Sequence, residues 1–421
     1  MNNKIVKINK KIQNIIFKRS LLTLGILLFI RIGTFLPVPG INSSDLAFYL
    51  QSHSVARGLV STFSGDNTFV IGLFTLNIFP YINASILVQV ILGFSPQLSK
   101  RQKEGDLEGR RFINQLTRLI TLGWAIIQSV SLSLYLKQVL FDWNYTLAFE
   151  IVIWLTTGAM IVLWLSEIIT DYGLGNGASL LIYTNIVSNL PNLSKKIFID
   201  NLTFPSQIGI LLLIFVLLYG IVFLQEGVRT IRLISSKQLN QSTVQDLNLV
   251  ESNYYIPLRF NQAGVMPIIL TTAILVVPNY INSMGLWPKI NFPINLEYFK
   301  FLYWIGYFVL ILLFSSFYAK IVLNPKDMSD QLQKMAVTIP GVRPGIQTTF
   351  YLKQVLQRIT LIGAIMLAFL VIIPNFIEST LNITNLNGLS TPSLLIVAGV
   401  VLDLVREVKN IYYSNIYNNM Y

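Results

Sequence analysis

Apolar stretches close to twenty residues long recur along this chain of 421 residues, separated by shorter polar segments. A helix of about 20 apolar residues crosses a hydrocarbon core of roughly 30 Å. The pattern therefore predicts an all-α polytopic membrane protein with ten transmembrane helices. We place them at about 20–38, 72–94, 116–136, 147–169, 177–192, 206–225, 262–282, 301–323, 356–377 and 391–409.

The second span contains an unusual segment, "NIFPYINASI", at residues 77–86. It places a proline, two asparagines and a serine among isoleucines. Polar side chains and a missing backbone donor are costly in lipid, so such residues usually face protein or a water-filled cavity. We expect this segment to face something other than lipid.

Positive charges fall mostly on one side of this topology. With the N-terminus on the cytoplasmic side, 24 of the 31 lysines and arginines lie in the tails and loops predicted for that side. Lysine and arginine are enriched on the cytoplasmic side of membrane proteins, so the asymmetry supports ten spans with both chain ends inside. The surplus in the net charge of +12 also suits an anionic partner.

The spans divide near residue 200 into two sets of five. Because each set has an odd number of spans, the two halves are expected to be inverted relative to each other, an arrangement that builds a pathway at their interface. The predicted organisation is a cytoplasmic-side tail at 1–19, a first half at 20–200, a second half at 201–410 with cytoplasmic loops at 226–260 and 324–355, and a short C-terminal tail at 411–421.

The second of these cytoplasmic loops contains "IPGVRPGIQT", which is more than a simple connection needs. Proline fixes φ and glycine permits positive φ, so this segment predicts a stiff tip that presents Arg343.

Composition limits the chemistry that the chain can perform. Only 12% of residues are charged, about half the usual share in soluble proteins. The absence of cysteine excludes disulfides and thiolate metal sites, and the single histidine, His53, lies in a predicted loop. We expect no cofactor and no metal.

Three classes of function remain open on the pattern alone. A membrane enzyme would have to use Glu150, Glu167 or Asp403, which are isolated or close to span ends. An ion-coupled transporter would need ionisable groups near the midplane, where Arg31 is the one deep charge.

A pore for a large and chemically varied substrate is the third class. Such a pore should line its narrowest point with apolar side chains that do not bind the cargo. Isoleucines four residues apart lie on one helical face at Ile78 and Ile82, and again at Ile182 and Ile186. Isoleucine is abundant here, however, and usually faces lipid or core.

Longer motifs favour the pore. In order along the chain they are "RIGTFLPVPGI", "FPYINASI", "KEGDLEGRRFINQLTR", "SEIITDYGLGNGASLLI", "YIPLRFNQAGVMPIIL", "NPKDMSDQLQKMAVTIPGVRPGIQT" and "SLLIVAGVVLD". Together they resemble the SecY family, the large subunit of the Sec protein-conducting channel, from about residue 20 to 410. The resemblance implies ten spans in two pseudo-symmetric halves around a central pore. The expected function is passive conduction of unfolded, signal-bearing polypeptides, with sideways release of apolar segments into lipid and no enzymatic activity.

The resemblance also assigns site residues by motif. The implied pore ring is Ile78, Ile82, Ile182, Ile186, Ile269 and Ile396. The implied plug lies at about 61–72 and includes Phe63, Ser64 and Gly65, although "STFSGDNTFVIG" departs from common bacterial versions after "FSG". The lateral gate, formed by spans 2 and 3 against 7 and 8, has polar candidates at Asn83, Gln128, Asn261 and Gln262. The implied docking surface for partners has Arg229, Arg232, Lys334 and Arg343.

The same resemblance implies partners and a compartment. Expected partners are a SecE-like single-span subunit, a SecG-like subunit, the SecA motor ATPase, the ribosome, unfolded preproteins and membrane lipid. Richness in Ile, Asn, Lys and Tyr, the short C-terminal tail and the lack of a transit-peptide pattern favour a plastid-encoded protein of the thylakoid membrane. A bacterial plasma membrane is the alternative.

Overall fold

The structure is a computed structural model that describes residues 2–39, 71–95, 107–136, 144–199, 204–235, 255–262, 264, 267–268, 270–271, 296–381 and 391–420. Contacts between Cα atoms divide the chain into two compact units. Unit 1 comprises Met1–Lys195 and Val400–Tyr421, and unit 2 comprises Lys196–Gly399. Each unit is described by itself below.

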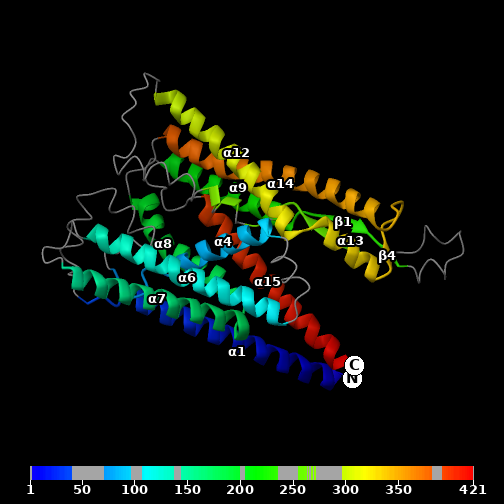
Figure 1. The fold of residues 1–421 in the computed structure, drawn as a ribbon, viewed down its shortest axis with the longest axis horizontal. Coiled ribbons are helices and arrows are strands. Elements are labelled where there is room, and N and C mark those ends of the chain that lie inside the picture. Colours follow the sequence, from blue (N-terminus) through cyan, green and yellow to red (C-terminus); the bar gives the residue numbers. More distant parts are fainter. Residues whose placement is uncertain are drawn as a thin grey trace, which may run out of the picture. The chain divides into compact units, whose positions relative to one another are not determined.

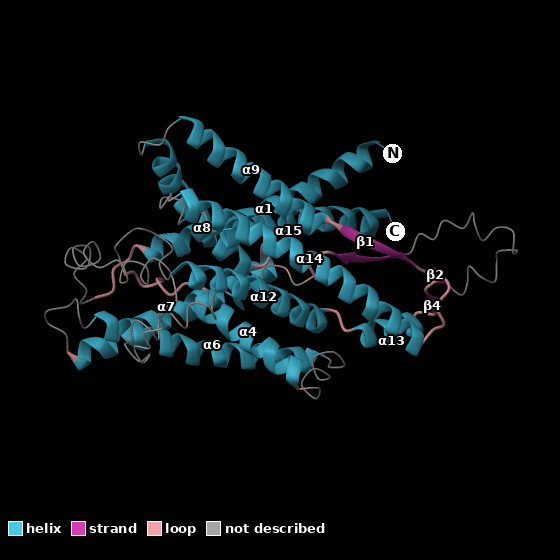
Figure 2. Ribbon diagram, turned by 90° about the horizontal axis from the view of Figure 1, so that it is seen from above, coloured by secondary structure: helices cyan, strands magenta, loops and turns pink. Residues whose placement is uncertain are grey.

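Helices joined by turns make up most of the described residues of unit 1 (Figure 1). Helix α6 packs against both α4 and α7, and α7 also packs against α1. The N-terminal end of α1 and the C-terminal end of α15 lie at the same end of this unit (Figures 1 and 2). The helices are α1 (Asn2–Thr34), α4 (Phe79–Phe94), α6 (Leu107–Leu136), α7 (Tyr145–Tyr172), nearly all of α8 (Gly177–Ile199) and the C-terminal part of α15 (Thr391–Met420).

Unit 2 combines long apolar helices with short strands. Helix α14 packs against α9, α12 and α13, and it carries a proline, Pro374, near its C-terminal end. The elements are α9 (Phe204–Glu226), β1 (Val228–Arg232), β2 (Ile234–Ser235), β3 (Tyr255–Arg259), α12 (Leu296–Val322), α13 (Pro325–Lys334), β4 (Val337–Thr338), α14 (Ile346–Leu381) and the first part of α15.

Two hydrophobic clusters hold unit 2 together. One joins α9, α12, α14 and α15 through side chains such as Ile221, Ile311 and Leu395, which are fully buried. The other lies beneath the strands and includes Ile231, Leu258 and Leu352. The short strands are therefore fixed to the end of α14 by apolar packing, and they form one continuous platform with it.

The strands form two small antiparallel sheets within the segments predicted as cytoplasmic loops. Strand β1 pairs with β3, and β2 pairs with β4 (Figure 2). The fold is mostly helical, as predicted, but the all-α description leaves these strands out. They are short, and only one side chain of β1, Ile231, is buried, so the alternation that marks a half-buried strand is weak in the sequence.

The described helices overlap nine of the ten predicted spans and differ from them at their ends, whereas most of the predicted span at 262–282 lies outside the described residues. Among the described residues, four stretches are long and apolar enough to cross a membrane: Arg111–Leu134, Tyr145–Tyr172, Trp304–Lys334 and Ile346–Pro374. Three shorter apolar helices cover Phe79–Leu92, Gly177–Ser188 and Leu212–Glu226. Within the described residues, the count of ten spans and the pseudo-symmetry of the halves stay predictions.

The second span begins later as a helix than predicted. Residues 73–78 form turns, and α4 begins only at Phe79. Asn77 has a φ of +46°, in the left-handed region that ends any right-handed helix, and a proline occupies the first turn of α4. The predicted tails also differ, because residues 2–19 continue into α1 and residues 411–420 continue α15.

Candidate functional site

The turn before α4 is built around the side chain of Asn77. Asparagine tolerates positive φ better than most residues, which explains its use at this position. Its Oδ1 accepts a hydrogen bond from the backbone N–H of Ile78 at 2.8 Å. Its Nδ2 donates to Oδ1 of Asn185 on α8 at 3.1 Å. Both asparagines are buried, with exposed fractions of 3% and 9%.

Helix α8 is held close to α7 at its first residue. The backbone N–H of Gly177 donates to Oγ1 of Thr170 at 2.9 Å, and a Cβ at this glycine would collide with the carbonyl oxygen of Ser166. Only glycine fits such an approach. Oδ1 of Asn176 then accepts from the N–H of Ala178 at 3.0 Å and supplies the cap of α8. These contacts fix the start of the helix that carries Asn185.

The isoleucines predicted to line a pore have different surroundings. Ile78 and Ile82 are buried in protein, with exposed fractions of 1% and 6%, so neither is open to lipid in this structure. Ile182 and Ile186 on α8 are half-buried. The hydrogen bond between Asn77 and Asn185 joins the two segments of unit 1 that carry these four isoleucines.

The remaining pore and plug residues belong to other parts of the chain. Ile396 is half-buried on the part of α15 that belongs to unit 2. Ile269 and the plug residues Phe63, Ser64 and Gly65 lie outside the described residues. The ring as a whole therefore stays a prediction.

The predicted gate residues are half-buried polar side chains in both units. In unit 1, Asn83 lies on α4 and Gln128 on α6, and Oε1 of Gln128 is buried without a hydrogen-bond partner among the described residues. In unit 2, Nδ2 of Asn261 donates to the carbonyl oxygen of Gly264 at 3.0 Å. Nε2 of Gln262 is buried and also lacks a partner within the described part of the chain.

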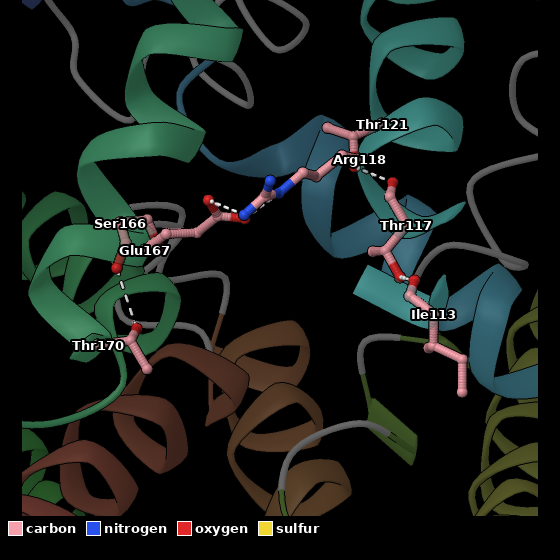
Figure 3. A network of polar contacts seen from close by, with 7 residues as sticks. All are labelled: Ile113, Thr117, Arg118, Thr121, Ser166, Glu167 and Thr170. Carbon is pink, nitrogen blue, oxygen red and sulfur yellow. Dashed lines mark hydrogen bonds and ion pairs between the residues drawn. The ribbon is translucent and has the colours of Figure 1, made fainter. Parts of the chain in front are cut away.

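A polar cavity of roughly 200 Å³ lies within unit 1, between α4, α6, α7 and the start of α8. Figure 3 shows Arg118 of α6 reaching to Glu167 of α7. Nε and Nη2 of the arginine donate to the two carboxylate oxygens, each at 2.8 Å. Such a fork engages both oxygens of the carboxylate. Other residues that line the cavity are Tyr81, Asn114, Asp171 and Asn176.

These pairings bear on the residues that an enzyme would have to use. Glu167 is paired through both oxygens, and Asp403 accepts from Nη1 of Arg406 at 3.2 Å. Glu150 lies near the start of α7 and is exposed. The three carboxylates are therefore not gathered at one described site where they would act together.

The predicted tip is anchored as its sequence suggests. Gly341 and Gly345 have φ values of +76° and +100°, in the region that favours glycine. Oγ of Ser329 on α13 donates to the carbonyl oxygen of Gly345 at 3.0 Å, and Oγ1 of Thr348 donates to that of Arg343 at 2.9 Å. The side chain of Arg343 is exposed between these anchors.

The other predicted docking residues are also exposed and positive. Arg229 and Arg232 project from β1, opposite Leu258 and Tyr255 of β3, and Lys334 ends α13. All four docking candidates lie in unit 2, on elements attached to the cluster beneath the strands. Exposed guanidinium groups on rigid backbone suit carboxylate or phosphate groups of a partner.

Two contacts in unit 1, the hydrogen bond between Asn77 and Asn185 and the ion pair of Arg118 with Glu167, cannot be predicted from the sequence alone. The bond between Asn77 and Asn185 joins residues 108 positions apart, and the pair of Arg118 and Glu167 joins residues 49 apart. The sequence shows only that polar residues occur deep within apolar spans. Such residues need a polar partner, but the sequence does not show which residue that partner is.

Comparison with known proteins identifies the chain. The SecY family model matches residues 72–405, which is most of the sequence. The chain belongs to the SecY family. A relative from Trieres chinensis, a protein translocase subunit SecY, is 62% identical over 416 residues, covering 96% of this chain and 98% of the relative. A protein translocase subunit SecY from Porphyra purpurea is 42% identical and covers 94% and 96%.

Solved structures agree on the fold of this SecY-family chain. A protein-conducting channel superposes with a TM-score of 0.65 at 17% identity, covering 94% of this chain and 93% of that one. Sec61 from the canine ribosome–channel complex superposes with a TM-score of 0.61 at 16% identity, covering 94% and 93%. Identities this low support the architecture alone, while the plastid-genome relatives carry the family assignment.

Proposed function

We propose that this chain is the channel-forming subunit of a protein translocase, which conducts unfolded, signal-bearing polypeptides across a membrane and releases apolar segments sideways into lipid. The observation that carries this function is 62% identity to a protein translocase subunit SecY over nearly the full length of both proteins. The channel itself performs no enzymatic reaction, and energy comes from the SecA ATPase or from the translating ribosome.

The constriction of the pore is formed by the isoleucines that the motifs assign. Two local observations support this proposal for unit 1. Ile78 and Ile82 are buried in protein instead of open to lipid, and a hydrogen bond ties their segment to the helix that carries Ile182 and Ile186. Apolar side chains at a narrow point exclude ions by dewetting and make few specific contacts with cargo.

The lateral gate uses Asn83, Gln128, Asn261 and Gln262. Support comes from one buried side-chain atom in each unit that has no hydrogen-bond partner among the described residues. Gln128 holds a buried acceptor and Gln262 a buried donor, and neither has a partner among the described residues. A buried polar atom without a partner costs free energy. We therefore expect each of these two atoms to form a hydrogen bond with protein or with water in the closed or the open gate.

The exposed arginines of unit 2 form the docking surface for the energy source. A solved relative, Sec61, is found in a ribosome–channel complex, and an idle yeast Ssh1 complex is bound to the yeast 80S ribosome. Arginine suits RNA phosphate and acidic protein surfaces alike because its planar fork donates two parallel hydrogen bonds. SecE-like and SecG-like subunits complete the proposed assembly.

The chain is a multi-pass membrane protein, and we place it in the thylakoid membrane of a plastid. Its relatives include SecY proteins from plastid genomes of algae and one from the cyanobacterium Synechocystis, which is 38% identical over 418 residues. A bacterial plasma membrane is the alternative location. Immunogold labelling of the source cells distinguishes them.

Reconstitution tests the function directly. Purified chain in lipid vesicles with a matching SecE-like subunit, SecA and ATP is expected to move a presecretory polypeptide into a protease-protected lumen. A polypeptide with a disrupted signal sequence is the control and should remain accessible to protease. Accumulation of a small solute against a gradient, with no polypeptide transport, would instead establish an ion-coupled transporter.

A further inference from the structure

Two buried asparagines, Asn77 and Asn185, lie among the isoleucines of unit 1. Asn77 immediately precedes Ile78, and Asn185 lies between Ile182 and Ile186 on α8. Residues three apart on a helix share a face, so Asn185 lies on the same face as Ile182, and it directly precedes Ile186 in the sequence. Polar amides at this level are unexpected beside an apolar constriction.

The side-chain amide of Asn77 makes two hydrogen bonds, one to the backbone of Ile78 and one to the side chain of Asn185. Asn77 uses Oδ1 for the N–H of Ile78 at 2.8 Å and Nδ2 for Oδ1 of Asn185 at 3.1 Å. The Ile78 N–H lies at the N-terminal end of α4, where a helix has no internal acceptor. One side chain therefore satisfies the N–H of the residue just before α4 and links this turn to α8, and both side chains are almost completely buried.

The bond has two consequences for the isoleucines beside it. It fixes the start of α4, with Ile78 just before the helix and Ile82 within it, relative to α8. It also hides two amides that would otherwise attract water, because a buried polar group without a partner is costly and is commonly satisfied by an internal water. A water at this level would begin to wet the constriction.

We propose that Asn77 and Asn185 are positioning residues of the constriction: their mutual hydrogen bond holds the four isoleucines of unit 1 at one level and keeps polar groups out of the pore surface. This inference rests on the proposed function, because it assumes that these isoleucines line the pore. It adds that the seal depends on a specific buried amide pair behind the apolar side chains.

The test is resting ion conductance of the purified channel in planar bilayers, measured without cargo. Asn77→Gly removes the amide while tolerating a φ of +46°, and Asn185→Leu removes the other amide at similar volume. Thr184→Ala is the matched control on α8, since the hydroxyl of Thr184 donates only to Leu180 in its own helix among the described residues. Thermal unfolding in detergent is recorded for each variant.

Each single variant is expected to fold and to raise the resting conductance about five-fold, the population change that corresponds to about 1 kcal/mol at 25 °C. The variant with both changes should leak no more than the leakier single variant, because one interaction is lost in both cases. Thr184→Ala should conduct like the unchanged channel. Asn77→Ala, which also strains the backbone, should leak at least as much as Asn77→Gly.

Two results would overturn the inference while leaving the proposed function intact. One is an unchanged conductance in folded Asn77→Gly and Asn185→Leu variants when Ile82→Asn does leak. The other is a double variant whose leak is the product of the two single effects, since independent sites multiply. If Ile82→Asn is also silent, the pore assignment itself fails.

Discussion

At the scale of single residues, the burial of Ile82 separates two explanations for an apolar side chain at this position in a segment that also holds polar residues. If Ile82 served lipid contact, Ile82→Asn would mainly reduce membrane insertion and stability, since a polar side chain would meet hydrocarbon. Ile82 is only 6% exposed, so we expect a different result. The variant should fold, leak ions and accept weaker signal sequences, because a polar group wets the constriction.

Single-channel conductance in planar bilayers measures this prediction, and transport of a polypeptide with a defective signal measures the second part. Ile91→Asn is a suitable comparison, because Ile91 lies on the same helix and is exposed. That variant should lose membrane insertion without gaining a leak. A stable Ile82→Asn channel with normal resting conductance and normal signal selectivity would contradict the pore assignment.

A second residue-scale prediction concerns Arg118 and Glu167. Their side chains are 53% and 31% exposed, so solvent screens the pair and its contribution to the free energy of unfolding should be modest, about 1 kcal/mol or less. Arg118→Gln should lower the thermal unfolding temperature slightly. Arg118→Lys keeps the positive charge but loses the two-pronged hydrogen bond. Its unfolding temperature should lie between those of the unchanged protein and Arg118→Gln.

Equal unfolding temperatures for all three forms would show that the ion pair does not stabilise the contact between α6 and α7. A loss much larger than about 1 kcal/mol would show that the cavity shields the pair from solvent more than the exposures suggest.

At the scale of elements, the sequence predicts helices from hydrophobic periodicity and length, and it locates them well. Helix α8 begins at Gly177, as predicted, because "GLGNG" supplies both the glycine and the capping asparagine. The start of α4 is mispredicted, because hydropathy does not register the left-handed backbone at Asn77. Strands β1 and β3 are also missed, since their pairing joins residues from separate parts of one long loop.

The rigid tip allows a prediction at this scale. Arg343→Glu should weaken SecA binding and motor-driven transport without unfolding the platform, because the side chain is exposed and its backbone is anchored from α13 and α14. Loss of one charge-assisted, bidentate contact costs about 1.5–3 kcal/mol of binding, and the new charge adds repulsion. Equilibrium binding of SecA to channel in nanodiscs gives the affinity.

Arg343→Lys distinguishes charge from geometry at the same position. It should retain part of the affinity if a single positive charge is enough, and little if both donors of the fork are required. An Arg343→Glu channel with unchanged SecA affinity would leave this arginine with a role in topology alone.

At the scale of the whole molecule, hydropathy locates the spans, and the distribution of lysine and arginine predicts on which side of the membrane each loop lies. The structure divides the chain after Lys195 and again before Val400, so unit 1 includes the C-terminal part of α15 and the two units are not two sets of five spans. The division near residue 200 into two halves of five spans stays a prediction. Contacts between residues far apart in the sequence, such as the hydrogen bond of Asn77 with Asn185, cannot be read from local patterns. The side of the membrane that each loop occupies, by contrast, follows from lysine and arginine counts.

Topology is therefore the prediction that tests the whole molecule. The loops at 96–115 and 324–355 should lie on the same side as both chain ends, because 24 of 31 positive residues would then face the cytoplasmic side. The chain has no cysteine, so single substitutions introduce unique labelling sites. Ser99→Cys and Gln347→Cys should react with a membrane-impermeant maleimide in vesicles that expose the cytoplasmic side. Asn144→Cys, at the exposed start of α7, should react only after the vesicles are opened. Labelling of Ser99→Cys and Gln347→Cys from opposite sides would exclude an even number of spans between them, and with it the arrangement of ten.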